Sequence, residues 1–497
     1  MRTLLIVNAK LWGCEEYDSV LIAGDRIEKI GHEDRLRREA PASVHIVDAD
    51  GRILLPGLTD AHMHLLSYAR TKRWLDLRGA KSIDEIKRLV ARKAEELGPG
   101  TWVLGRGWDQ DKLAERRMPT RWDLDEAAPR NLVLLVRVCG HVAVANSLAL
   151  RTIGLEDGAP DPPGGALGRE GSKLNGLLFE GAVELAYKAI PKPTPKEAAA
   201  LMREALKEAA SYGLVELHSM SASQLEVTVY ESVRGPGVPK VYFYAESFDV
   251  QGANVVGVKV FMDGSFGART ARLRSPYSDA PHTRGVLLMD STKLKQVLNE
   301  AARRGLQVAV HAIGDEAVSE ALKCASPNMR IEHASLTPPD LIRELTEARI
   351  PVSVQPHFIL SDTWIVDRLG RDRARWVYAY RSLLDAGVIL AGSSDAPVEP
   401  LNPWLGVAAA VGRGAKEGLP IYDASAVEAL TPQDAVSLYI KGPLVRRGGE
   451  RRIRPGCPAD LVLVDARKVE ELARGNVRVL LTLIDGWVAY SALETQR

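Results

Sequence analysis

Two histidines one residue apart, His62 and His64, end the apolar stretch LLPGLTDAHMHL at positions 54–65. Residues two apart in an extended strand point to the same side, so both imidazoles would face the same way. Neutral imidazole is a common metal ligand, and two imidazoles at a strand end form half of a metal site. A bare pair of this kind also arises by chance, so its meaning depends on what the rest of the chain places beside it.

Four more ligand-type residues lie in or follow apolar runs that resemble buried strands. They are Lys259 in VVGVKVFMDG, His311 in LQVAVHAIGD, His333 in NMRIEHAS and Asp395 in VILAGSSDAP. A lysine inside an apolar strand is costly unless its charge is removed or paired, and a buried ion pair of Lys259 with Asp263 or Asp395 is the simpler alternative. Each residue alone is unremarkable, and their joint placement near strand ends is what favours a metal site.

Strand-like runs alternate with helix-like segments through the middle of the chain. The predicted strands are 53–61, 214–219, 240–245, 255–262, 306–311, 329–333, 351–356 and 388–394, with helices between most of them, such as 195–211 and 292–304. This α/β alternation favours a TIM-like (β/α)8 barrel over an open sheet. The carboxyl ends of barrel strands meet at one mouth, so the six residues would come together there.

Two regions stand outside this alternation. Residues 1–53 and 447–497 carry short strands with turn signals at Gly24-Asp25 and Asp485-Gly486, and we expect both ends to form one β-sandwich domain. The barrel domain is expected over 54–446, with an insertion at about 67–193 that is too long for a single connection. We predict that this insertion is a lid subdomain over the carboxyl-terminal end of the barrel.

Composition narrows the class of protein. The 497 residues carry a net charge of +1, which gives no reason to expect nucleic acid or an anionic membrane as a partner, and no apolar run approaches a membrane span. The four cysteines are scattered, so we expect reduced thiols and a cytoplasmic location. Only 9 Asn and 8 Gln accompany many charged residues, which suggests a thermophilic source.

A family resemblance joins these observations. The chain is similar to the amidohydrolase superfamily of metal-dependent hydrolases, and within it to the YtcJ-like branch, amidohydrolase family 3. The stretches that carry the resemblance are PGLTDAHMHL, GHVAVANSLAL, VKVFMDGSFGARTA, VAVHAIGDEAV, RIEHASL, VSVQPHF, GSSDAPVEP and PGCPADLVLVD. They cover nearly the whole chain in the expected order.

The resemblance implies a site with two divalent metal ions, with zinc as the expected metal. His62 and His64 would bind the more buried ion with Asp395, and His311 and His333 would bind the second. Lys259 would be carbamylated, and its new carboxylate would bridge both ions. Asp395 would also be the catalytic residue that takes the proton of the attacking water.

Substrate contacts are expected from five further residues. His218 would end the second barrel strand, His357 follows the seventh, and Asp263 follows Lys259 by four residues. His141 and Trp108 lie in the insertion, and Glu180 is a further lid residue to consider. For His141, Trp108 and Glu180 the alternative is local capping, core packing or a solvated helix face.

The expected reaction is hydrolysis of an amide-type C–N bond other than a peptide bond, in a small N-acyl or N-formyl substrate with an apolar part. An esterase, a phosphotriesterase or a deaminase on the same scaffold is the alternative. Deaminases of this superfamily usually lack the bridging lysine, so Lys259 argues against that version. A non-catalytic scaffold protein is a remote alternative, because such relatives usually lack the metal ligands. The sequence leaves a homo-oligomer open.

Overall fold

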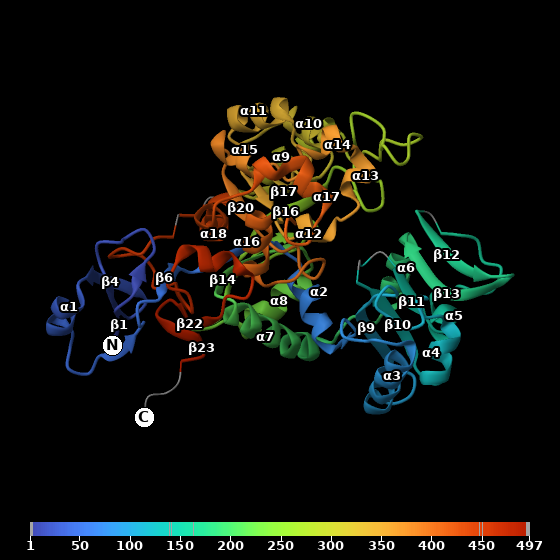
Figure 1. The fold of residues 1–497 in the computed structure, drawn as a ribbon, viewed down its shortest axis with the longest axis horizontal. Coiled ribbons are helices and arrows are strands. Elements are labelled where there is room, and N and C mark those ends of the chain that lie inside the picture. Colours follow the sequence, from blue (N-terminus) through green and yellow to red (C-terminus); the bar gives the residue numbers. More distant parts are fainter. Residues whose placement is uncertain are drawn as a thin grey trace. The chain divides into compact units, whose positions relative to one another are not determined.

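The computed structural model describes residues 3–138, 140, 142–162, 164–446, 448–449 and 451–493. Within the chain, contacts separate two compact units, one made of residues 1–69 with 195–497 and the other of residues 70–194 (Figure 1). The first unit therefore contains both ends of the chain, and the second is an insertion into it.

An eight-stranded parallel sheet forms the centre of the first unit, and its strand order is β20-β19-β18-β17-β16-β15-β14-β7. The strands are β7 (Leu58–Met63), β14 (Leu214–Ala222), β15 (Lys240–Ala245), β16 (Val255–Phe261), β17 (Gln307–Ala312), β18 (Met329–His333), β19 (Val352–Val354) and β20 (Leu390–Gly392). Strands follow one another round the sheet in chain order, and β20 comes back against β7. The sheet is thus a nearly closed barrel, which confirms the predicted (β/α)8 fold.

Helices between the strands cover the outside of the barrel. They include α7 (Pro195–Ser211), α8 (Gln224–Val233), α9 (Ser291–Arg303), α10 (Asp315–Leu322), α11 (Pro339–Ala348) and α15 (Tyr380–Asp385). Apolar faces of these helices and of the strands share one large core. The helices begin where capping predicts: the Asp290 side chain accepts a hydrogen bond from the backbone N–H of Lys293 at the start of α9.

Two small sheets built from the chain's ends pack on each other in the first unit. One has the order β4-β3-β1-β5, with β1 (Thr3–Val7), β3 (Ser19–Ala23), β4 (Arg26–Gly31) and β5 (His45–Asp48). The other has the order β2-β6-β21-β22-β23, with β2 (Lys10–Leu11), β6 (Ile53–Pro56), β21 (Leu461–Val464), β22 (Val479–Ile484) and β23 (Trp487–Ser491). Leu4 and Ile6 share one apolar cluster with Leu461 and Leu463. The predicted β-sandwich of both termini is therefore present.

The inserted unit has its own six-stranded sheet, in the order β12-β13-β11-β10-β9-β8. Its strands are β8 (Leu75–Asp76), β9 (Trp102–Trp108), β10 (Leu132–Arg137), β11 (Val142–Ala145), β12 (Gly165–Glu170) and β13 (Lys173–Glu180), with helices α3 (Ile83–Leu97), α4 (Arg121–Ala127), α5 (Ser147–Ile153) and α6 (Gly181–Ala189). Separate apolar clusters lie on the two faces of this sheet. That the unit acts as a lid stays a prediction.

Candidate metal centre

The register of the barrel brings most of the predicted ligand residues to one end. Phe261, two residues after Lys259, is the partner of His311, and Ala312 is the partner of His333. On the other side of the barrel, the backbone N–H of Asp395 donates to the carbonyl of His62 over 2.7 Å. The carboxyl ends of parallel strands therefore carry these side chains to one mouth, as the barrel predicts.

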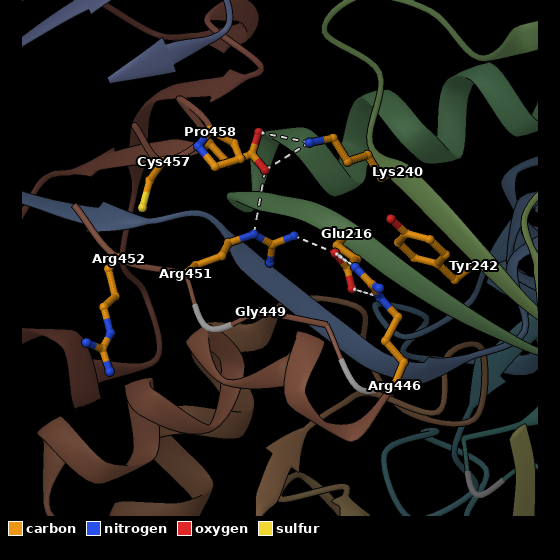
Figure 2. Close-up of a pocket in the computed structure, with 10 residues that line it drawn as sticks. Glu216, Lys240, Tyr242, Arg446, Gly449, Arg451, Arg452, Cys457 and Pro458 are labelled. Carbon is orange, nitrogen blue, oxygen red and sulfur yellow. Dashed lines mark hydrogen bonds and ion pairs between the residues drawn. The ribbon is translucent and has the colours of Figure 1, made fainter. Parts of the chain in front are cut away.

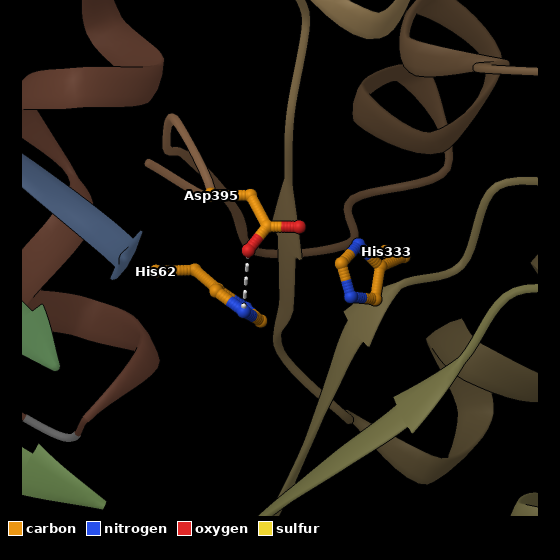
Figure 3. Close-up of side chains that lie close together, drawn as sticks. All are labelled: His62, His333 and Asp395. Atoms are coloured by element: carbon orange, nitrogen blue, oxygen red, sulfur yellow. Dashed lines mark ion pairs between the residues drawn. The ribbon is translucent and has the colours of Figure 1, made fainter. Parts of the chain in front are cut away.

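His62, His333 and Asp395 lie close enough to hold one metal ion (Figure 3). One ligand atom from each lies within 4.8 Å of the others, and all three side chains are buried. Nε2 of His64 lies 3.2 Å from Oδ1 of Asp395, and the rings of His311 and His333 lie 4.5 Å apart between centroids. The four histidines and Asp395 thus form one cluster.

Hydrogen bonds fix which nitrogen of each imidazole faces this cluster. Nδ1 of His62 lies 2.7 Å from Oε2 of Glu332, and Nδ1 of His64 lies 3.1 Å from the carbonyl of Met220. An ionised carboxylate and a carbonyl can only accept, so each Nδ1 carries a hydrogen, and in the neutral ring Nε2 keeps its lone pair. These lone pairs are directed towards the carboxylate of Asp395.

The other two histidines are held in the same way by different atoms. Nδ1 of His333 donates to Oε1 of Gln355 over 2.7 Å, while the amide nitrogen of Gln355 donates to Ser393. His311 is reversed, because its Nε2 donates to the carbonyl of Gly264 over 2.9 Å and leaves Nδ1 with the lone pair. Burial lowers the pKa of His311 to about 3 and that of His333 well below its ordinary value, which favours the neutral form that binds metals.

The amine of Lys259 is buried without a partner in the part of the chain that the structure describes. Its Nζ has no hydrogen-bond partner among the described residues, and the ion pairs with Asp263 or Asp395 that the sequence left open are not formed there. Burial lowers the pKa of Lys259 to about 8 against the opposing charges of Glu332 and Asp395. Nζ lies 5.2 Å from the ring centroid of Phe261.

The donor set fits a bound cation. Oδ1 of Asp395 is buried without a hydrogen-bond partner in the described part of the chain, and it faces imidazole lone pairs 3.2 and 3.4 Å away. Electron-rich atoms at this separation repel one another unless a positive charge lies between them.

Two buried aspartates hold the loops that carry the ligands. Asp60 accepts hydrogen bonds from the backbone N–H groups of His62 and Ser394, and burial raises its pKa to about 7. The carboxylate of Asp263 accepts the backbone N–H groups of Arg272, Ile313 and Gly314. Asp263 was predicted as a substrate contact. Its contacts instead give it a role in fixing the loops after β16 and β17.

His218 corrects the sequence prediction. Strand β14 continues to Ala222, so His218 lies in the middle of the strand and not at its end. Its side chain is fully buried inside the barrel, where Nε2 bonds to Glu216 over 2.8 Å and Nδ1 accepts from Arg330 over 3.0 Å. Burial lowers the pKa of His218 to about 4, so it is a neutral interior residue.

The remaining predicted contacts have different outcomes. Trp108 is fully buried in the apolar core of the inserted unit, where its Nε1 donates to the carbonyl of Leu135 over 3.0 Å, and this packing accounts for it without a substrate. His357 follows β19, and its Nδ1 contacts the carboxylate of Glu399, which also accepts from Ser361. His357 stays a candidate substrate contact. His141 lies outside the described residues.

A second polar cluster, which the sequence did not indicate, lies near the starts of β14 and β15 (Figure 2). The carboxylate of Glu216 binds Arg446 over 2.7 Å and Arg451 over 2.6 Å, beside a cavity of about 300 Å³. Lys240 on the same cavity is paired with Asp460 and with Asp485 over 2.7 Å. Since these cations face carboxylates, the cluster ties the barrel to the strands of the C-terminal segment.

Known proteins resemble this chain in sequence and in structure. The model of the amidohydrolase family matches residues 45–490. The putative amidohydrolase YtcJ of Bacillus subtilis is 30% identical over 95% of this chain and 96% of its own length. An N-substituted formamide deformylase of Arthrobacter pascens is 26% identical over 99% of this chain and 98% of its own length. An uncharacterized metal-dependent hydrolase of Pyrococcus horikoshii has a similar structure, with a TM-score of 0.79, 31% identity, and coverage of 95% of this chain and 99% of that one.

Proposed function

This chain belongs to the amidohydrolase family and is a metal-dependent hydrolase, and from that premise we propose that it cleaves an amide-type C–N bond other than a peptide bond. The proposed substrate is a small N-acyl or N-formyl compound with an apolar part. The observation that carries the proposal is the convergence of His62, His333 and Asp395 at the barrel mouth, with ligand atoms within 4.8 Å of one another. The similarity to an N-substituted formamide deformylase supports the choice of an N-formyl group.

We propose that the site holds two divalent ions and that both are zinc. His62, His64 and Asp395 would hold one ion, and His311 and His333 the other. Bound divalent ions supply an activated water and polarise the carbonyl to be attacked. The pre-oriented imidazoles and the unpartnered oxygen of Asp395 are the features of this chain that suit such ions.

Lys259 is proposed to bridge the two ions as a carbamate. The neutral amine forms a bond from Nζ to the carbon of carbon dioxide and releases one proton, which leaves a carboxylate on the side chain. Only the neutral amine reacts, and the burial that lowers the pKa of Lys259 to about 8 makes this form accessible near neutrality. The absence of a hydrogen-bond partner for Nζ among the described residues leaves the amine available.

Asp395 is proposed as the general base. The proton lost by the attacking water passes to its carboxylate and then to the nitrogen of the leaving amine, so the amide C–N bond breaks while a carboxylic acid and an amine form. Oδ1 of Asp395 has no hydrogen-bond partner among the described residues, so this oxygen is available to accept that proton.

The apolar part of the substrate is proposed to contact Phe261. This side chain is 42% exposed at the end of β16, and its ring lies 5.2 Å from the ring of His311 between centroids. Leu288 is also exposed, and its backbone N–H donates to the carbonyl of Met262, the residue after Phe261. An apolar substituent beside the scissile bond would cover both side chains.

A substrate panel on metal-replete protein tests the proposal. Protein purified without chelator should contain close to two zinc ions per chain and should hydrolyse N-formyl or N-acyl amides in preference to esters and phosphotriesters. A content of one zinc ion or less per chain, together with turnover of an amino-heterocycle, would show that the protein is a deaminase. Turnover of esters or phosphotriesters alone would replace it with the corresponding hydrolase. A cytoplasmic location, a thermophilic source and a homo-oligomer stay predictions.

A further inference from the structure

An arginine and a glutamate form a fully buried ion pair inside the barrel, directly below the candidate metal centre. Arg330 and Glu332 are both 0% exposed, and they lie two residues apart on β18, so their side chains share the interior face. Nε of Arg330 lies 2.6 Å from Oε1 of Glu332, and Nη2 donates to Oε2 over 3.1 Å. A buried ion pair is a weak source of stability, because removing both charges from water offsets most of their attraction.

The carboxylate of this pair reaches a predicted metal ligand. Oε2 of Glu332 accepts the hydrogen of Nδ1 of His62 over 2.7 Å. The acceptors for His64, His311 and His333 are the neutral oxygens of Met220, Gly264 and Gln355. Among these four histidines, only His62 has an ionised group as its hydrogen-bond acceptor; Oδ1 of Asp263 lies 3.6 Å from Nε2 of His311, beyond hydrogen-bond distance.

Arg330 is in turn fixed by groups from neighbouring strands. Nη2 donates to the carbonyl of Ala61, the residue before His62, over 2.7 Å. Nη1 donates to the hydroxyl of Tyr244 over 3.1 Å and to Nδ1 of His218 over 3.0 Å. The guanidinium therefore contacts β7, β14 and β15 while it holds Glu332, so the carboxylate has little freedom to move away from His62.

We propose that Glu332, held by Arg330, is a positioning residue for the metal centre: it keeps the hydrogen of His62 on Nδ1 and directs Nε2 to the ion. This inference rests on the metal site of the proposed function. A carboxylate that accepts from an imidazole also makes the other ring nitrogen a stronger donor, and loss of such partners typically costs about 10–100-fold in metal affinity. Arg330 balances the charge, so Glu332 acts on His62 without adding net negative charge to the site.

The test uses Glu332→Gln and the charge-balanced double variant Glu332→Gln/Arg330→Met. Zinc affinity is measured by chelator competition. The visible absorption spectrum of the Co²⁺-substituted protein reports the ligands around the ion, and the melting temperature of metal-free protein reports stability. We expect Glu332→Gln to lower both the affinity for one ion, by about 10–100-fold, and the melting temperature. The double variant should recover part of the melting temperature but not the affinity, because it removes the unpaired charge without restoring the carboxylate.

Two further variants keep the test decisive. Glu428→Gln is the matched control, because Glu428 is a buried carboxylate of the same unit that accepts hydrogen bonds from Ser382 and contacts no predicted metal ligand. It should lower the melting temperature and leave zinc affinity and the Co²⁺ spectrum unchanged. Glu332→Asp keeps the charge and shortens the reach, and it should lower affinity even if Glu332→Gln fails to fold. Wild-type affinity in Glu332→Asp or in the double variant would overturn the inference. Absence of metal binding by the wild-type protein would instead overturn the proposed function.

Discussion

Nε2 of His64 lies 3.2 Å from Oδ1 of Asp395, at the seam where the first and last strands of the barrel meet. Backbone hydrogen bonds hold this seam: the N–H of His64 donates to the carbonyl of Ala396 over 2.8 Å, and the N–H of Asp395 to the carbonyl of His62 over 2.7 Å. The loop after β20 is thus fastened to the end of β7, and the carboxylate of Asp395 is held against both histidines of the HxH pair.

Asp395→Asn should abolish most of the hydrolysis. An amide cannot take the proton of the attacking water, and loss of a general base typically costs about 10²–10⁴-fold in rate. The amide oxygen can still be a weak ligand, so we expect kcat to fall by more than the metal content does. Elemental analysis of the same preparation used for kinetics separates the two effects. A kcat within tenfold of the wild-type value would show that another residue is the base.

Lys259→Ala should lose at least one metal ion and nearly all activity, because the bridging carboxylate cannot form. Lys259→Arg keeps a positive charge but cannot be carbamylated, so it should fail in the same way, whereas a buried ion pair would tolerate it better. Small carboxylic acids added to Lys259→Ala should restore part of both properties by occupying the gap. Reconstitution of metal-free wild-type protein with zinc should improve with bicarbonate. An unmodified amine in density or by mass, with two metals bound and full activity, would contradict the assignment.

The ends of the strands could be predicted from the sequence, but the depth of each side chain within the barrel could not. The apolar runs before His311, His333 and Asp395 predict strands, and parallel strands bring their carboxyl ends together, so the cluster could be predicted. His218 was misplaced because a strand's length depends on its neighbours: β14 pairs with β7 as far as Ser219 and with β15 as far as Ala222. Whether a residue points into the mouth or the interior depends on that length and register, which one strand's sequence does not carry.

The contacts between residues on different strands of the barrel could not be predicted from the sequence either. Glu332 precedes His333 in the motif RIEHAS, and the alternation of a strand places it on the opposite face from its neighbour, but nothing local shows that it meets His62. Trp108 shows a second limit. The local sequence around an aromatic residue does not tell whether the side chain packs in a core or contacts a substrate.

Phe261→Ala should change substrate preference more than turnover of small substrates. Loss of an apolar wall removes contact with an apolar substituent, which is worth about 1–3 kcal/mol, or 10–200-fold in kcat/KM. A formamide with a large apolar group should lose this much, and one with a methyl group should lose little. Val488→Ala, an exposed apolar residue of β23, is the control and should change neither. Equal losses for both substrates would mean that Phe261 supports the metal site and does not select the substrate.

Glu226→Gln should weaken the pH dependence of stability. Glu226 is buried in α8 and accepts a hydrogen bond from Ser219 over 2.5 Å, and burial raises its pKa to about 7. The folded chain then binds this proton more tightly than the unfolded chain, in which the pKa is about 4.5. The stabilising effect is therefore fully present below about pH 4.5 and is lost as the pH rises through about 7.

The shift corresponds to about 2.5 kcal/mol lost from the free energy of unfolding between pH 5 and pH 8. Glutamine is neutral throughout, so Glu226→Gln should lose less stability over this interval and should be the more stable protein at pH 8. Asp60 and Asp263, whose pKa values burial also raises to about 7, contribute equally to both proteins, so the difference between the two slopes isolates Glu226. Denaturant unfolding of metal-free protein at several pH values measures the slopes, with Glu231→Gln on the same helix as the control. Parallel slopes for the wild type and Glu226→Gln would mean that Glu226 keeps its ordinary pKa in the folded protein.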